Sequence, residues 1–92
     1  MSYQVELSRR ARKAFLVLPA RDRRLIERRL LALANDPRPP GVKALTQASR
    51  GYYRLRVGDY RIIYTVQDDK LLVGVIRIGP RHSVYDDMAS GT

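Results

Sequence analysis

Three arginines lie close together in a stretch whose pattern predicts a β-hairpin. From residue 51 to residue 64, apolar and polar residues alternate on both sides of a Gly-Asp dipeptide at 58–59. This pattern is typical of two antiparallel strands joined by a two-residue loop. With that loop, Arg56 pairs with Arg61, and Arg54 lies on the same face of the sheet. Guanidinium groups match phosphate oxygens with forked hydrogen bonds, so the three side chains predict an anion site suited to phosphate.

This clustering of positive charge opposes the pairing of the two strands. Like charges directly opposite each other destabilise a sheet by roughly 0.2–1 kcal/mol per pair. Opposite charges would keep the face soluble without that repulsion, which favours an anion site over the alternative of three solvated arginines. The other face of the hairpin is apolar and is expected to face the core: Tyr53, Leu55, Val57, Tyr60, Ile62 and Tyr64.

More polar side chains follow the last predicted strand. Because that strand is expected to pair antiparallel with the one before it, its end returns to the level of Arg61. Arg81 is therefore expected beside the hairpin arginines, with Tyr85 within reach and His82 as a further candidate acid or base. Two alternatives stay open: Tyr85 packs on the core, and His82 is a surface or capping residue.

A short strand and two helices are predicted before the hairpin. Residues 3–7 alternate as a strand, and Ser8 is a good N-cap for the helix that follows. Apolar residues at helical spacing extend this helix over residues 9–18, where a proline ends it. A second helix runs from residue 20 or 21 to residue 34. Its apolar stripe comprises Leu25, Ile26, Leu30 and Leu33.

The rest of the chain predicts a meander. A stiff loop at 35–41, rich in proline, leads to the hairpin, whose second strand continues to Gln67. A tight turn at Asp68-Asp69 and a strand at 71–78 follow, with Gln67 opposite Lys70. The expected fold class is α+β, with an N-terminal strand and a two-helix hairpin packed on a mainly antiparallel sheet that ends in a three-stranded meander. The helices cover the apolar face and leave the arginine face open.

Length indicates the number of domains, and charge indicates the kind of partner. The 92 residues suffice for one domain with a modest core, and residues 86–92 are expected to form a flexible tail. The formal net charge of +9 favours a polyanionic partner such as nucleic acid. Residues 1–50 hold 12 Lys/Arg against 4 Asp/Glu, whereas residues 51–92 hold 6 against 5. The helices therefore form either a broad surface for a nucleic-acid backbone or a solvated basic face.

Several classes of site are not expected. The chain has no cysteine and one histidine, so it predicts no disulfide, no metal site and no cofactor. The adjacent acidic pairs at 68–69 and 86–87 are interpreted as solvated carboxylates. The sequence shows neither an apolar run that would span a bilayer nor a signal-peptide pattern, so no membrane partner and a cytoplasmic location are expected.

Two stretches resemble a known family. The sequence GYYRLRVGDYRIIY from Gly51 to Tyr64, with GPRHSVY from Gly79 to Tyr85, is similar to the RelE/ParE superfamily of bacterial and archaeal type II toxins. The likeness begins at Tyr3 and includes the opening strand, the basic helical hairpin, an Asn-x-Pro loop and the Arg-x-Gly-x-Tyr-Arg hairpin. Resemblance to the RelE branch implies a ribosome-dependent endoribonuclease, an mRNA interferase that cuts mRNA in the A site without a metal and inhibits translation.

The resemblance also implies a set of catalytic residues. By motif position, two basic residues on the first hairpin strand fall on Arg54 and Arg56, and the arginine after the hairpin tyrosine falls on Arg61. An arginine after the last strand falls on Arg81, and a tyrosine near the C-terminus falls on Tyr85. The first two are often lysines in RelE proteins. Arginines at these positions keep the positive charge but, unlike lysines, cannot lose a proton.

The implied reaction is attack of an mRNA 2′-hydroxyl on the adjacent phosphate, which leaves a 2′,3′-cyclic phosphate and a 5′-hydroxyl. In this hypothesis Arg61 and Arg81 bind the phosphate, and Tyr85 is the base, with His82 as an alternative acid or base. Arg54 and Arg56 contribute a positive electrostatic field at the phosphate, and one of them protonates or neutralises the leaving oxygen. Contacts to ribosomal RNA are expected from Arg21, Arg24, Arg28 and Lys43.

Two other functions stay open at this point. One is a ParE-like module that poisons DNA gyrase without nuclease activity, and the other is a nucleic-acid-binding protein whose site is inactive. Either toxin function implies a cognate antitoxin as partner in a hetero-oligomer. We expect that antitoxin to be acidic, and partly disordered until it folds on the basic surface.

Overall fold

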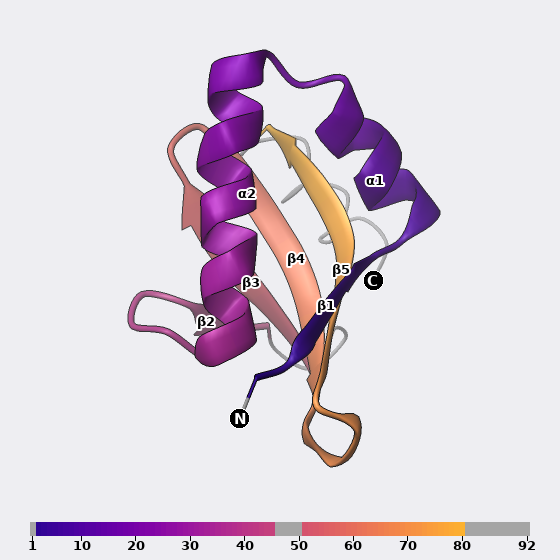
Figure 1. Ribbon diagram of the computed structural model, residues 1–92. Helices are drawn as coiled ribbons and strands as arrows, with labels where there is room; N and C mark the ends of the chain where they lie inside the picture. The colour runs from indigo at the N-terminus through magenta and orange to yellow at the C-terminus, as the bar shows by residue number, and fades with distance from the viewer. Residues whose placement is uncertain (1, 46–50, 81–92) are drawn as a thin grey trace.

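The computed structural model describes residues 2–45 and 51–80 of the chain and places two helices against a five-stranded sheet (Figure 1). The strand order across the sheet is β1-β5-β4-β3-β2. In chain order, the elements are β1 (Gln4–Leu7), α1 (Arg9–Leu16), α2 (Ala20–Asn35), β2 (Lys43–Ala44), β3 (Tyr52–Val57), β4 (Tyr60–Gln67), the 3₁₀ turn η2 (Asp68–Lys70) and β5 (Leu72–Pro80). The predicted α+β class and the helical hairpin are confirmed.

The first helix begins as the sequence predicts and ends earlier. The Ser8 hydroxyl accepts a hydrogen bond from the backbone N–H of Ala11 at 3.1 Å, which satisfies one of the free donors of the first turn. Helix α1 ends at Leu16 rather than at residue 18. The residue before a proline is disfavoured in the helical region, so Leu18 lies in the connection and Pro19 serves as the N-cap position of α2.

The hairpin has the predicted register. Arg56 lies opposite Arg61, Leu55 opposite Ile62, and Val57 opposite Tyr60. Gly58 takes a φ of +57°, the conformation that the first position of the two-residue loop requires. The arginine face and the apolar face are therefore separated as the alternation indicates.

The turn between β4 and β5 is longer than predicted, and the predicted pairing of Gln67 with Lys70 is wrong. Residues 68–70 form η2, Leu71 adopts a left-handed φ of +50°, and Gln67 pairs with Leu72. The register is thus displaced by two residues. Because side chains alternate with a period of two, this even displacement keeps Val73 and Val75 on the core face.

A β-bulge at Ile76 changes the face of the sheet to which the last residues of β5 project. Tyr64 lies opposite Val75, but Ile63 lies opposite Arg77, so β5 contains one extra residue. Ile78 consequently turns into the core, where it is 4% exposed, and Arg77 shares the face of Ile63. The Ser8 hydroxyl donates to the Ile76 carbonyl at 3.0 Å, which ties the bulge to the start of α1.

The two edge strands come from distant parts of the chain. Strand β1 pairs in parallel with β5, from Gln4 opposite Leu72 to Leu7 opposite Val75. At the other edge, the two-residue strand β2 pairs antiparallel with β3 and places Lys43 opposite Arg54. The sequence pattern did not predict β2.

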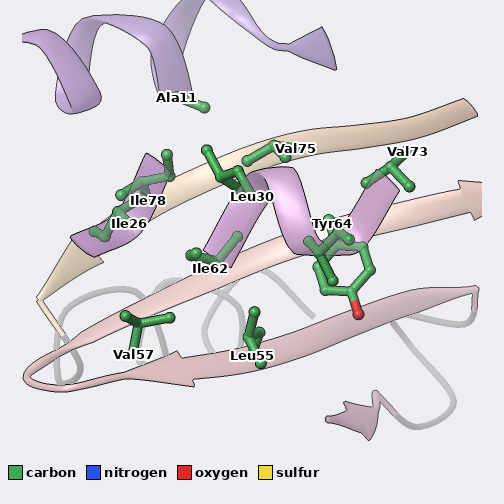
Figure 2. Close-up of a cluster of buried hydrophobic side chains, with 11 residues drawn as sticks. Ala11, Ile26, Leu30, Leu55, Val57, Ile62, Tyr64, Val73, Val75 and Ile78 are labelled. Carbon is green, nitrogen blue, oxygen red and sulfur yellow. The ribbon is translucent and has the colours of Figure 1, made fainter. Parts of the chain in front are cut away.

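The core lies between the helices and one face of the sheet (Figure 2). Its members come from both helices and from the three central strands: Ala11, Ile26, Leu30, Leu33, Leu55, Val57, Ile62, Tyr64, Val73, Val75 and Ile78. Leu25, which was predicted to belong to the apolar stripe of α2, is instead 39% exposed. The fully buried Tyr64 donates its hydroxyl to the Pro37 carbonyl at 2.7 Å, so its polar atom is satisfied.

Neither helix of the described residues is long and apolar enough to cross a membrane.

Candidate active site

The face of the sheet opposite the core carries a cavity of about 320 Å³. Strands β2, β3 and β4 and the loop before β2 supply its described lining, which consists of Gly41, Lys43, Arg54, Arg56 and Arg61. Four of these five residues are cations. The cavity therefore forms where the sequence predicts an anion site.

The strand register brings the four cations together. Directly opposed residues on neighbouring strands project to the same face, which places Lys43 beside Arg54 and Arg56 beside Arg61. Two steps along β3 separate Arg54 from Arg56, so the two pairs are stacked along the strand at a spacing of about 7 Å. The result is a compact positively charged pocket on a rigid sheet.

The inner wall of the pocket is shielded from water. The Nε and Nη1 atoms of Arg61 are buried, and Ile63, on the same face, is 1% exposed. Charge–charge interactions strengthen where water is excluded. A phosphate in this pocket would therefore interact more strongly with Arg61 than with an arginine on an open helix.

The described lining of the pocket contains no carboxylate. In addition, no group of three or more His, Cys, Asp or Glu residues in the described part of the chain is arranged to hold a metal ion. The chemistry available from these side chains is binding and neutralisation of negative charge, with Lys43 as a group that can also transfer a proton.

The pocket contains one residue that the sequence did not place beside the hairpin arginines. Lys43 was assigned to the RNA-binding surface, but the structure places it inside the arginine pocket. A two-residue strand is too short to give a periodic signal, so the sequence could not indicate that β2 would pair with β3. Arg81, His82 and Tyr85 lie outside the described residues, and their roles stay predictions, as do the roles of the three pocket arginines.

The other residues predicted to bind RNA gather on α2. Arg21, Arg24 and Arg28 line a second cavity of about 290 Å³ with Asp22 and Leu25. Their spacing of three and four residues places them on one face of the helix. The structure thus separates two basic sites, one on the open sheet face and one on α2.

The hairpin tyrosine next to Arg61 does not serve as a base. Tyr60 projects to the opposite face of the sheet and donates its hydroxyl to Asp22 at 2.7 Å. This hydrogen bond to a carboxylate raises the pKa of Tyr60, so the phenol keeps its proton.

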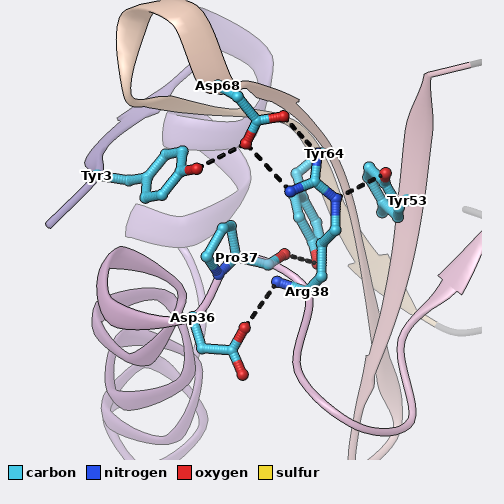
Figure 3. A network of polar contacts seen from close by, with 7 residues as sticks. All are labelled: Tyr3, Asp36, Pro37, Arg38, Tyr53, Tyr64 and Asp68. Atoms are coloured by element: carbon cyan, nitrogen blue, oxygen red, sulfur yellow. Dashed lines mark hydrogen bonds and ion pairs between the residues drawn. The ribbon is translucent and has the colours of Figure 1, made fainter. Parts of the chain in front are cut away.

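A polar network at the other end of the hairpin fixes the loop that leads to the pocket (Figure 3). Arg38 forms a forked pair with Asp68 at 2.8 and 3.1 Å, and its Nε donates to the Tyr53 hydroxyl at 2.9 Å. Tyr3 donates to the same Asp68 carboxylate at 2.6 Å. Arg38 and Tyr3 together lower the pKa of Asp68 to about 2.

Asp68 is exposed, as expected for a solvated carboxylate, and it is also the acceptor of this network. Arg38 and Asp68 are 30 residues apart in the sequence and meet only because β4 ends near the loop after α2. The same loop continues to Gly41, whose φ of +91° favours glycine, and then to Lys43. The network therefore anchors the segment that supplies two of the pocket residues.

Comparisons with known proteins agree with this arrangement. A family model described as the ParE toxin of the type II toxin-antitoxin system parDE matches residues 5–85. The mRNA interferase toxin RelE of Escherichia coli K12 is 30% identical over 89 residues, which are 95% of this chain and 94% of the relative.

Solved structures show the same fold. The toxin-antitoxin complex RelBE2 from Mycobacterium tuberculosis contains a chain with a TM-score of 0.79 and 26% identity, matched over 88% of this chain and 100% of that chain. The archaeal RelE-RelB complex from Pyrococcus horikoshii OT3 matches with a TM-score of 0.78 and 30% identity, over 89% of this chain and 98% of that chain. The first is described as a toxin-antitoxin complex, and the second as a RelE-RelB complex.

Proposed function

Because this chain belongs to the RelE/ParE superfamily of type II toxins, we propose that it is an mRNA interferase that cleaves mRNA in the ribosomal A site. The observation that carries the proposal is the cavity lined by Lys43, Arg54, Arg56 and Arg61. Four cations on one rigid face suit a phosphate whose negative charge increases during the reaction. Preorganised positive groups of this kind contribute strongly to transition-state stabilisation.

The reaction is an internal transfer at one phosphodiester. The 2′-oxygen attacks the adjacent phosphorus, the bond from phosphorus to the 5′-oxygen breaks, and the products are a 2′,3′-cyclic phosphate and a 5′-hydroxyl. One proton leaves the 2′-hydroxyl and one proton reaches the 5′-oxygen, so the step requires a base and an acid. Arg61 and Arg81 bind the phosphate, Tyr85 is the base, and Arg54 and Arg56 stabilise the charge of the transition state.

The arginines on α2 have a separate role in this proposal. Arg21, Arg24 and Arg28 contact the phosphates of ribosomal RNA and orient the toxin on the ribosome. Replacing all three by alanine weakens ribosome binding and reduces its salt dependence, while the arginine pocket keeps its composition. The protein works in the cytoplasm, where the ribosome and mRNA are found.

An antitoxin is the other partner in this proposal. Relatives have been crystallised as toxin-antitoxin complexes, and the net charge of +9 favours an acidic partner. The antitoxin covers the basic surfaces and blocks access to the ribosome.

The deciding experiment is primer extension on a defined mRNA, programmed on purified ribosomes with an open A site. We expect a cut within the A-site codon that requires ribosomes and persists after the protein is treated with EDTA. Arg61→Ala and Tyr85→Phe should both lose the cut, whereas Arg12→Ala, an exposed arginine on α1, should keep it. Folded wild-type protein that leaves the mRNA intact would refute the proposal.

A second candidate follows from the description of the matching family model, which names the ParE toxin. A ParE-like toxin would poison DNA gyrase without cutting RNA. Inhibition of gyrase supercoiling by wild-type protein and by Arg61→Ala alike, with no cleavage of mRNA on ribosomes, would establish this function in place of the first.

A further inference from the structure

The arginine pocket lacks an obvious acid for the leaving group if its arginines alone are considered. Breaking the bond from phosphorus to the 5′-oxygen produces an alkoxide unless a proton is delivered as the bond breaks. Guanidinium groups bind and neutralise oxyanions but do not lose a proton in proteins. Arg54, Arg56 and Arg61 can therefore stabilise this oxygen electrostatically without protonating it.

Lys43 is the residue in the described lining of the pocket whose side chain can give up a proton. Its ammonium group carries three N–H donors and has a neutral amine form. The residue is exposed and lies on the edge strand β2, so a nucleic-acid strand can reach it from outside the sheet.

The position of Lys43 also separates it from Arg61, which binds the phosphate in the proposed function. Lys43 lies opposite Arg54, whereas Arg61 lies opposite Arg56, two residues further along β3. A phosphate held by Arg61 therefore has Lys43 to one side along the strand rather than directly beneath it. This offset suits a group that contacts a bridging oxygen instead of the two non-bridging oxygens.

Two tyrosines of the hairpin are turned away from the pocket. Tyr60 donates to Asp22 and Tyr53 accepts from Arg38, and both project to the face opposite the pocket. Tyr52 shares the face of Arg54 but does not belong to the described lining of the pocket. Among the described lining residues of the pocket, Lys43 is both exposed and able to transfer a proton.

We propose that Lys43 is the general acid that protonates the 5′-oxygen as the phosphodiester bond breaks. The proposal rests on the proposed function. In this step the bond from phosphorus to the 5′-oxygen breaks, its electron pair remains on oxygen, and one N–H proton of the Lys43 ammonium moves to that oxygen. The neutral amine is then protonated again by solvent, and the proton from the 2′-hydroxyl is taken up by the base.

The test uses two mRNAs on programmed ribosomes, one ordinary and one with sulfur in place of the 5′-oxygen at the scissile linkage. A thiolate leaves without being protonated, because a thiol is far more acidic than an alcohol. We expect Lys43→Arg to slow single-turnover cleavage of the ordinary mRNA by about 10²–10³-fold. The same variant should cleave the sulfur-containing mRNA at close to the wild-type rate.

The controls separate this role from others. Lys43→Gln should show the same rescue by sulfur, with a weaker binding of mRNA because the charge is lost. Lys13→Gln, which removes an exposed lysine on α1, should cleave the ordinary mRNA at close to the wild-type rate, because this lysine lies outside the described lining of the pocket. Urea unfolding of each variant checks that the edge strand still forms.

Three outcomes would overturn the proposal. Wild-type activity of Lys43→Arg on the ordinary mRNA would show that only the charge matters. An equal loss on both mRNAs would show that Lys43 positions the RNA rather than protonating the leaving group. Absence of cleavage by the wild type would refute the proposed function itself, and the assignment of Lys43 with it.

Discussion

Arg38 and Arg61 show two opposite uses of the same side chain. Arg38 is held in a forked pair with Asp68 at 2.8 and 3.1 Å, and its guanidinium carbon lies 5.4 Å from the centre of the Tyr53 ring. Arg61 lies opposite Arg56 in a pocket with two more cations. The first arrangement joins segments of the chain, and the second concentrates one sign of charge. The two arginines thus differ in their surroundings: Arg38 faces a carboxylate, and Arg61 lies among other cations.

The apolar face of the sheet makes the second arrangement possible. Burying a side chain such as Leu55 or Ile62 contributes roughly 1.5–3 kcal/mol, whereas the repulsion between opposed arginines costs about 0.2–1 kcal/mol. Both residues are almost fully buried beneath the helices. The core therefore holds the register against the repulsion of Arg56 and Arg61, and the charges remain where the fold places them.

The test with the largest expected effect replaces each of the two arginines by alanine. Arg61→Ala should reduce cleavage on ribosomes by about 10²–10³-fold, because it removes a preorganised charge from the phosphate site. Relief of the repulsion with Arg56 should limit the fall in its urea midpoint. Arg38→Ala should do the reverse and lower the urea midpoint more than the cleavage rate. Equal effects of the two changes on both measurements would contradict the distinction.

A second prediction concerns the core side of the loop that supplies the pocket. Tyr64→Phe removes the hydroxyl that donates to Pro37 at 2.7 Å and leaves a buried carbonyl without that partner. We expect the free energy of unfolding to fall by about 1–3 kcal/mol. Urea denaturation measures this change. Tyr52→Phe, the same change at a half-buried tyrosine of β3, is the matched comparison.

A third prediction uses the repulsion directly. Arg56→Glu places a carboxylate opposite Arg61 and converts a repulsive cross-strand pair into an attractive one. We expect the protein to gain from a few tenths to about 1 kcal/mol of stability, and to lose cleavage because the pocket loses two units of positive charge. A destabilised Arg56→Glu variant would show that the opposed arginines do not strain the hairpin.

The smallest effect is a dependence of stability on pH. Because the pKa of Asp68 falls from 3.8 to about 2 on folding, the carboxylate stabilises the native state fully above pH 4. That contribution is lost as the pH falls from about 4 to about 2. The difference in urea midpoint between wild type and Asp68→Asn should therefore narrow across this interval. A constant difference would mean that the pair with Arg38 does not shift the titration.

The hairpin could be predicted from the sequence because two independent signals agree there. The alternation fixes which residues share a face, and the Gly58-Asp59 loop fixes the register. The bulge at Ile76 gave no such signal, since residues 71–76 contain no polar side chain and therefore show no alternation between the two faces. Sequence alone therefore could not assign Arg77 to the face of Ile63.

The candidate site was predicted in part for the same reason. Arg54, Arg56 and Arg61 belong to one hairpin, so local pairing brings them together. Lys43 and Gly41 reach the pocket through β2, which forms only because β3 offers it an edge. The pair of Arg38 with Asp68 likewise depends on tertiary topology. Contacts between distant segments leave no periodic pattern in a single sequence.

The parallel pairing of β1 with β5 has a consequence for the order in which the chain folds. Strand β1 can form its ladder of backbone hydrogen bonds only once β5 is present, because Gln4 pairs with Leu72 and Leu7 with Val75. Contacts between such distant residues form late, since a long loop must close first. Until β5 has been synthesised, β1 therefore lacks its partner strand, and the five-stranded scaffold of the toxin stays incomplete.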